Sequence, residues 1–307
     1  MIQAWLLKLH RWVALLFALP LLFVLGTGLV LAFEPWIVVR AIQPAALTVD
    51  KVQALLARHD ASGQVRSMTY RSYDDTLTLS AGMRGGTVID VRTGEALPEP
   101  SAMARTLQTM RRMHETLLID ASWLVTASSG AMLALSLLGI LMGWPRFANS
   151  LSGWHKGMAW GLLPLIILSP LTGIFLAAGI TFAPAPSRPS GPPEGGALSL
   201  QDAVRVVGQH HDLSGLVWLR TQGGRLVARI VEGGEYRTFA VTRDGTTALP
   251  RNWPRIWHEG NFAGIWSAAM NVIISVAMLA LLVTGVWIWS RRQLRRRRNR
   301  LQRVAAR

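Results

Sequence analysis

The chain has 307 residues, half of them hydrophobic, and a mean hydropathy of +0.30. This composition excludes an ordinary soluble globular protein. The net charge of +15 alone could suggest nucleic-acid binding, but the positions of the basic residues indicate a membrane protein instead. Because the chain has no cysteine, we also exclude disulfides, iron–sulfur clusters, thiolate metal sites and covalently attached c-type haem.

Four apolar runs are long enough to cross a bilayer, whose ~30 Å core needs roughly 20 helical residues. They cover residues 12–33, 121–144, 157–182 and 262–290. The first run is longer than the apolar part of a signal peptide and no clear cleavage site follows it, so we expect an uncleaved anchor. The predicted fold class is therefore an α-helical integral membrane protein with four transmembrane helices.

The charged residues predict how the chain is oriented. Three short segments, 1–11, 145–156 and 291–307, hold 13 Lys and Arg and no Asp or Glu. Short basic segments face the cytoplasm, so we expect both termini inside and the long segments 34–118 and 183–261 outside. The basic C-terminal segment is expected to bind anionic lipid, and no nucleic-acid partner is expected.

The two halves of the chain resemble each other. Outside the membrane, "ALTVDKVQALLARHD" (46–60) resembles "ALSLQDAVRVVGQHHD" (197–212), and each is followed by alternating β-branched stretches. Each external segment is thus predicted to be a small α+β module with one helix and about three strands. In the membrane, "LHRWVALLFALPLLFVLGTG" (9–28) parallels "WHKGMAWGLLPLIILSPLTG" (154–173). Two parallel tandem repeats predict a pseudo-two-fold axis along the membrane normal.

This repeat divides the chain into eight predicted segments. In order they are a first transmembrane helix, an external module, a second transmembrane helix, a cytoplasmic loop, a third transmembrane helix, a second external module, a fourth transmembrane helix and a basic cytoplasmic tail. Their predicted boundaries are 1–33, 34–112, 113–145, 146–156, 157–182, 183–256, 257–290 and 291–307.

Four histidines recur in the repeat and form two candidate pairs. His10 corresponds to His155 at the cytoplasmic edge, and His114 corresponds to His258 at the external edge. A two-fold axis would bring each pair together across the bundle, as bis-histidine ligation of a b-type haem requires. A single histidine at a membrane boundary is more often an interfacial or capping residue, but two pairs matched in repeat and in membrane side favour haem ligation.

Other residues near these histidines have less specific explanations. Arg11 and Lys156 are candidates to bind haem propionates, although the positive-inside rule alone accounts for them. Glycines in the runs would let helices approach a flat macrocycle, but small residues also serve ordinary helix packing. His59 and His210 also match across the repeat; because they end helices of the external modules, we expect them to be structural.

The segments "LHRWVALL", "MHETLL", "LLGILMGWPR", "WHKGMAW" and "WHEGNFAG" resemble the PepSY-associated transmembrane family, and the external segments resemble PepSY modules. The resemblance covers nearly the whole chain. It implies a multi-pass protein of the bacterial inner membrane with two haems b, whose irons have His10, His155, His114 and His258 as axial ligands. It also implies an oxidoreductase that reduces ferric siderophores on the periplasmic side. Some relatives carry a flavoprotein reductase domain that is not recognised here, so the expected electron donor is a quinol or a cytoplasmic flavoprotein reductase.

Basic and aromatic residues flank the external histidines and are candidates to contact a substrate or the propionates: Arg111, Arg112, Trp253, Arg255 and Trp257. A solvated basic and aromatic interface explains them equally well. Two other functions stay open. One is a haem-free, membrane-anchored regulator whose external modules bind a peptide or a peptidase. The other is a haem b electron carrier that serves a different periplasmic acceptor.

Overall fold

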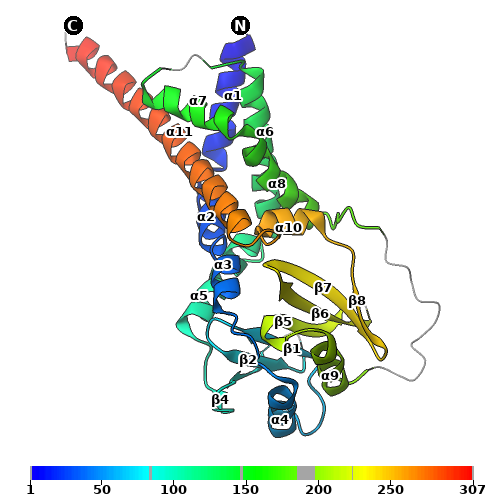
Figure 1. Cartoon of the computed structure of the whole chain (residues 1–307). Helices are drawn as coiled ribbons and strands as arrows, with labels where there is room; N and C mark the ends of the chain where they lie inside the picture. The colour runs from blue at the N-terminus through cyan, green and yellow to red at the C-terminus, as the bar shows by residue number, and fades with distance from the viewer. Residues whose placement is uncertain (1, 83–84, 146–147, 185–197, 223, 306–307) are drawn as a thin grey trace.

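A computed structural model describes the whole chain except residues 1, 83–84, 146–147, 185–197, 223 and 306–307. The predicted cytoplasmic loop and the second external module therefore each lie partly outside the described residues. A helical bundle forms one part of the molecule and a β-sheet with its own helices forms the other (Figure 1). Both termini lie at the end of the bundle away from the sheet. We call this the terminal end of the bundle, and the opposite end the sheet end.

Seven helices form the bundle: α1 (Ile2–Leu16), α2 (Ala18–Leu31), α3 (Glu34–Ala41), α6 (Ser122–Leu141), α7 (Leu151–Gly161), α8 (Leu163–Ala177) and α11 (Ile265–Ala305). Three continuous stretches are long and apolar enough to cross a membrane, namely Ala18–Ala41, Ser122–Leu141 and Ile265–Val304. The pair α7 and α8 would make a fourth span, but the two helices meet at an angle of 66°. The bundle therefore has three or four candidate spans.

The bend between α7 and α8 differs from the straight third span expected over 157–182. Pro164 lies at the start of α8. Proline has no backbone N–H, and in a continuous helix its ring would clash with the carbonyl group four residues earlier. Helix α7 consequently ends at Gly161, and α8 begins a new direction at Leu163. The bend leaves α7, with its histidine, lying across the terminal end of the bundle (Figure 1).

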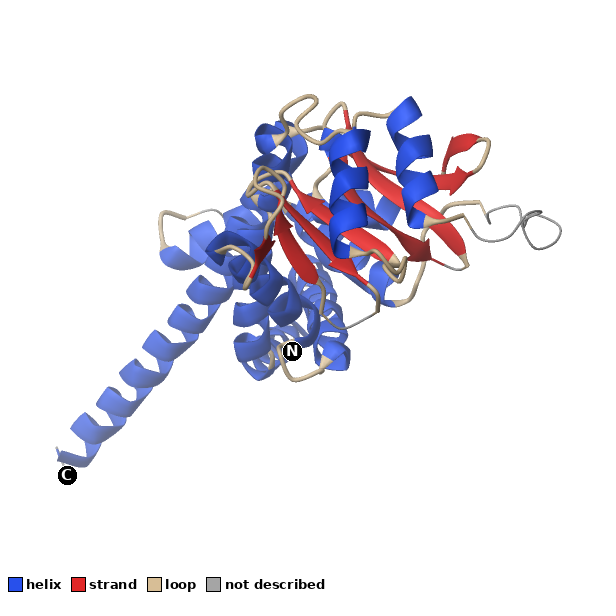
Figure 2. Ribbon diagram, turned by 90° about the horizontal axis from the view of Figure 1, so that it is seen from below, coloured by secondary structure: helices blue, strands red, loops and turns tan. Residues whose placement is uncertain are grey.

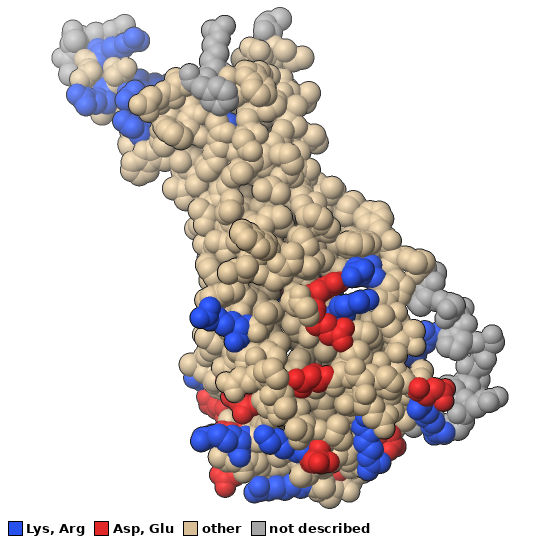
Figure 3. Space-filling model, viewed as in Figure 1, with Lys and Arg blue, Asp and Glu red and all other residues tan. Residues whose placement is uncertain are grey.

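The outside of the bundle carries large apolar side chains that a soluble protein would bury. Trp12 is 62% exposed and Trp266 is 79% exposed. On the face seen in Figure 3, the middle of the bundle is almost free of charged residues, which gather in the sheet part and at the C-terminal end of α11. Apolar exposure on this scale is typical of a surface covered by lipid, so the bundle is that of a membrane protein.

The strands of both predicted modules join in one eight-stranded antiparallel sheet, with the order β4-β3-β2-β1-β5-β6-β7-β8. The strands are β1 (Ser67–Arg71), β2 (Thr76–Ser80), β3 (Thr87–Asp90), β4 (Ala96–Leu97), β5 (Leu216–Gln222), β6 (Arg225–Glu232), β7 (Glu235–Thr242) and β8 (Gly245–Ala248). Each half thus contributes four strands rather than about three. The extra ones are the short edge strands β4 and β8, which follow turns. The two modules are continuous because β1 pairs with β5.

The pairing of β1 with β5 is symmetric about one residue pair. Met68 lies opposite Leu219 at its centre, with Ser67 opposite Arg220 on one side and Thr69 opposite Trp218 on the other. The helices that precede these strands, α4 (Val49–His59) and α9 (Leu200–His210), also begin alike. Thr48 and Ser199 each cap the following helix by accepting a hydrogen bond from a backbone N–H three residues later.

Helices α4 and α9 cover the face of the sheet that points away from the bundle, where they lie side by side (Figure 2). The core of this layer is made of aliphatic side chains that are completely or almost completely buried, including Val52, Leu56, Met68, Val204 and Leu219. The other face of the sheet points toward the bundle. Two helices, α5 (Ala102–Thr116) and α10 (Trp253–Glu259), lie at this junction, packed against α2 and α8 respectively.

Candidate functional site

His114 and His258 lie at the sheet end on two short helices, α5 and α10. The predicted transmembrane segments 113–145 and 257–290 placed them at the start of long membrane helices instead. Both short helices stop just after the histidine because a left-handed residue follows, Leu117 (φ 54°) after α5 and Gly260 (φ 65°) after α10. Each histidine is therefore held by a helix that ends before the next candidate span, and the spans α6 and α11 begin separately.

The structure brings the rings of His114 and His258 close together in a tilted arrangement. Their centroids are 6.0 Å apart and their planes are inclined by 49°. Two metal–imidazole bonds of about 2 Å each, placed end to end, put two ring centroids roughly 6 Å apart. The separation thus fits two axial ligands of a single iron, one from each half of the chain.

Helix α2 orients the ring of His114. Its Nδ1 lies 3.0 Å from the carbonyl oxygen of Val24 and 3.3 Å from the hydroxyl of Thr27. Because a carbonyl only accepts hydrogen bonds, Nδ1 must carry the proton, and the lone pair of the neutral ring is on Nε2. Gly28 makes this approach possible, because a Cβ atom there would lie 3.1 Å from Cε1 of the ring.

Helix α8 holds His258 in the same way. Its Nδ1 lies 3.2 Å from the carbonyl oxygen of Ser169 and 3.1 Å from the hydroxyl of Thr172. A Cβ atom at Gly173 would lie 3.3 Å from Cε1 of this ring. The Thr-Gly pairs that end the parallel stretches 9–28 and 154–173 thus pack against the rings of His114 and His258. They bind Nδ1 and leave Nε2 available for a metal.

Both histidines at the sheet end lie outside the candidate spans, and burial lowers the pKa of each. Burial lowers the pKa of His114 to about 4, and the neighbouring His258 adds to this effect. Burial likewise lowers the pKa of His258. A neutral imidazole is the protonation state that a metal requires of a histidine ligand.

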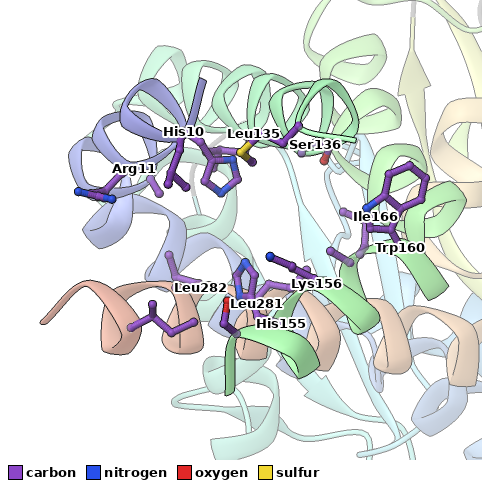
Figure 4. A pocket seen from close by; sticks show the side chains of 18 of the residues that line it. His10, Arg11, Leu135, Ser136, His155, Lys156, Trp160, Ile166, Leu281 and Leu282 are labelled. Atoms are coloured by element: carbon purple, nitrogen blue, oxygen red, sulfur yellow. The ribbon is translucent and has the colours of Figure 1, made fainter. Parts of the chain in front are cut away.

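His10 and His155 lie at the terminal end and line one cavity of about 880 Å³. Their rings enter it from opposite sides, His10 from α1 and His155 from α7 (Figure 4). The volume is in the range of ~300–1,000 Å³ typical of small-molecule and cofactor sites. The hydroxyl of Thr284 on α11 lies 2.8 Å from Nδ1 of His155, and the Cβ position of Gly285 lies 3.5 Å from its Cε1. The ring of His155 therefore packs against a Thr-Gly pair, as the rings of His114 and His258 do.

Three basic residues line the same cavity. The amine of Lys156 points into the space between the two histidines, whereas the guanidinium of Arg11 points away from them (Figure 4). Arg292 of α11 lines the cavity as well. Sequence analysis treated it only as part of the basic tail, because nothing in the sequence shows that α11 returns beside α7.

A partly buried ionic cluster adjoins His258. Glu259 accepts hydrogen bonds from Arg229 of β6 at 2.6 Å, from Arg255 at 2.8 Å and from the amide of Asn261 at 2.7 Å. Burial alone would raise the pKa of Glu259, but Arg229 and Arg255 outweigh it and hold this pKa well below its usual range. The cluster ties the bundle to the sheet at the external histidines.

A second ion pair joins Arg111 to Glu34 of α3. Of the predicted substrate residues, Arg111 and Arg255 are thus already bound to carboxylates. Arg112 is exposed, and Trp253 and Trp257 are partly exposed near the junction. Sequence analysis missed Glu34 and Arg229, because both come from segments far from the histidines in the chain.

Arg220 is a further basic residue that sequence analysis did not single out. Its guanidinium stacks on the ring of Trp218, 4.1 Å from the centroid. Both side chains alternate with Leu219, which is in the core under the helices, so they lie on the sheet face toward the bundle. Partial burial, Arg255 and Arg229 all lower the pKa of Arg220. Within the described part of the chain no carboxylate forms an ion pair with Arg220.

His59 and His210 lie away from both pairs. Nε2 of His59 is 3.0 Å from the carbonyl oxygen of Gly94, and Nδ1 of His210 is 2.9 Å from that of Val206 in its own helix. These contacts are local and fit the structural role expected of the two residues.

Among the described residues, no group of three or more His, Asp or Glu side chains is placed to hold a metal ion. A haem needs only two protein ligands, since the porphyrin supplies four nitrogens; the ring separation of His114 and His258 is compatible with that need, and His10 and His155 line one cavity. Comparison with curated proteins gives no match. A family model described as "PepSY-associated TM region" matches residues 7–292. The chain therefore belongs to the PepSY-associated transmembrane family.

Proposed function

We propose that this protein is a di-haem b reductase of the bacterial inner membrane that passes electrons outward to ferric siderophores. One observation carries the proposal. Histidines from the two halves of the chain form a pair at each end of a membrane bundle, and the external pair has the 6.0 Å ring separation of two axial ligands. The basic terminal end would face the cytoplasm and the sheet would lie in the periplasm.

The two histidine pairs would have different roles at the two ends of the bundle. His10 and His155 would hold the haem that receives electrons from a quinol or a cytoplasmic flavoprotein reductase, and His114 and His258 would hold the haem that passes them on. When bound, each haem supplies an iron that alternates between Fe(III) and Fe(II). The amine of Lys156 is placed to neutralise a propionate in the inner cavity. The Thr-Gly pairs that contact His114, His258 and His155 would fix the orientation and tautomer of these rings, and thereby their strength as axial ligands.

The proposed acceptor is a ferric siderophore, which holds Fe(III) through hard oxygen donors. Fe(II) is a softer ion and is held less strongly by such ligands, so that reduction releases the metal without destroying the chelator. The support is the family membership together with the position of His114 and His258 beside the sheet, which would lie in the periplasm. The predicted residues Arg112, Trp253 and Trp257 and the newly found Arg220 are the candidates to contact it.

The proposal predicts that the purified protein has the visible spectrum of low-spin b-type haem, with two haems per chain. Mixing the reduced protein with a ferric siderophore under anaerobic conditions should return the Soret band to its oxidised position and produce Fe(II), which a ferrous chelator such as ferrozine detects. Protein purified without haem would favour the haem-free PepSY regulator. Haems that stay reduced in the presence of ferric siderophores would favour an electron carrier for another acceptor.

A separate prediction concerns Arg220, the basic residue on the sheet face toward the bundle. Arg220→Ala should raise KM for an anionic ferric chelate about tenfold, which corresponds to about 1.4 kcal/mol of lost binding, with kcat little changed. The matched control is Arg237→Ala. Arg237 stacks on Phe239, a ring of the core on the opposite face of the sheet. Equal effects of the two substitutions on KM would count against a substrate contact at Arg220.

A further inference from the structure

The four paired histidines do not have equivalent surroundings. Three of them pack against Thr-Gly pairs, which are Thr27-Gly28, Thr172-Gly173 and Thr284-Gly285. The corresponding position of α6, which borders the cavity of His10, is the pair Leu138-Gly139. The threonine that each of the other histidines contacts therefore has no counterpart on α6, where the repeat position is occupied by Leu138.

This difference leaves a polar atom of His10 unsatisfied. Its Nδ1 is buried and has no hydrogen-bond partner among the residues that the structure describes. The backbone of Leu135, one turn before Leu138, lies near the ring of His10, but the contact does not meet hydrogen-bond geometry. In addition, nothing lies within 4 Å of the Cβ position of Gly139, so the ring of His10 is not seated on this glycine.

The threonine hydroxyls explain what His10 lacks. The hydroxyl of Thr284 donates to the carbonyl of Ala280 at 2.6 Å, so that its oxygen is left to accept from Nδ1 of His155. Such a partner fixes the tautomer of a ligating histidine, orients its ring and makes Nε2 a stronger ligand. Among the described residues, His10 has no such hydroxyl partner for its Nδ1.

We infer that His10 is the exchangeable axial ligand of this protein, and that the inner site is open to a small exogenous ligand while the external site is closed. The inference rests on the proposed function, since it assigns unequal roles to four proposed haem ligands. In chemical terms, a neutral diatomic ligand such as carbon monoxide would take the place of His10 when this histidine dissociates from ferrous iron. The residue that sets this property is Leu138, which acts through His10 as a positioning residue.

Carbon monoxide titration of the dithionite-reduced protein tests the inference. In the wild type we expect one of the two haems to bind CO, seen as a Soret change of half the full amplitude. Leu138→Thr should weaken CO binding about 10–100-fold, the usual effect of one such partner on metal affinity. The hydroxyl added by this change is satisfied, because it can bond to the carbonyl of Ala134 four residues earlier. Leu138→Val is the matched control, because valine has the shape of threonine and removes the same volume without adding a hydroxyl.

The reverse substitution tests the same idea at a site that already has its hydroxyl. Thr284→Val should strengthen CO binding at the inner haem, because His155 then loses its own partner. The inference is overturned if two haems are present and neither binds CO, if both bind it equally, or if Leu138→Thr and Leu138→Val behave alike. Those results would leave the proposed function intact. Absence of haem from the wild-type protein would instead overturn both.

Discussion

Replacing His258 with alanine is expected to remove the haem at the sheet end and to slow electron delivery to a ferric chelate. The loss should exceed the roughly 10–100-fold decrease in activity caused by substituting a residue that only hydrogen-bonds to a metal ligand. In the proposed function His258 would supply one of the two axial nitrogens of its site, and Nδ1 of its ring contacts both Ser169 and Thr172. Alanine cannot replace either the bond or the packing. The measurements are the haem-to-protein ratio by pyridine haemochrome and the rate at which ferric chelate reoxidises the reduced protein.

Two matched variants show whether this effect is specific to the site. His210→Ala removes a histidine that also ends a helix of the second half but whose Nδ1 contacts the carbonyl of Val206 in its own helix, away from both histidine pairs, so haem content should not change. His155→Ala should remove the other haem and leave the external one reducible by dithionite. A normal haem ratio in His258→Ala would rule out His258 as an axial ligand.

The second large effect is expected on stability, from Arg229→Ala. Arg229 and Glu259 form an ion pair in which the side chains are only 14% and 21% exposed. Removing one partner of a buried pair typically costs 3–5 kcal/mol, and since Arg255 and Asn261 still contact Glu259 we expect about 3 kcal/mol here. Thermal unfolding in detergent, followed by tryptophan fluorescence, should show Tm lowered by several degrees.

The control for this prediction is an exposed ion pair. Arg105→Ala breaks a contact with Glu99 in which both side chains are more than half exposed, so it should cost no more than about 1 kcal/mol. Equal decreases of Tm in the two variants would show that the Arg229–Glu259 pair stabilises the protein no more than an exposed ion pair does.

Acid pH should remove the difference between the wild type and Arg229→Ala. The folded protein holds the pKa of Glu259 below its ordinary value of 4.5, so the stabilisation is complete above that pH. It is lost as the pH falls below about 4.5 toward the lowered pKa of the folded state. Between pH 5 and 8 the difference in Tm should therefore be constant, and a difference that still persists in full at pH 3 would contradict this assignment.

Much of the fold could be predicted because its signals are local in the sequence. Apolar runs identify the spans, and the caps Thr48 and Ser199 mark the same helix in both halves. What the sequence could not show is how these elements meet. The sequence of β1 does not show that this strand pairs with β5, because backbone hydrogen bonds carry little sequence information.

The candidate site divides in the same way. The spacing of residues 10, 114, 155 and 258 in the repeat was enough to predict two histidine pairs, and the structure brings His114 and His258 together. The contribution of Arg229 was not predictable, because its partner Glu259 is 30 residues away on another element. The missing partner of His10 was equally hidden, since it depends on which side chain of α6 faces the ring.

The sequence by itself determined the membrane character of the protein, its two similar halves and the identity of the four histidines, because hydropathy and repetition are properties of the chain. Only the tertiary structure decided that the external modules form one sheet, that the external histidines lie on short helices outside the spans, and that the fourth histidine has no hydroxyl partner. These features depend on contacts between distant segments. Such contacts form only when burial of apolar surface brings the segments together.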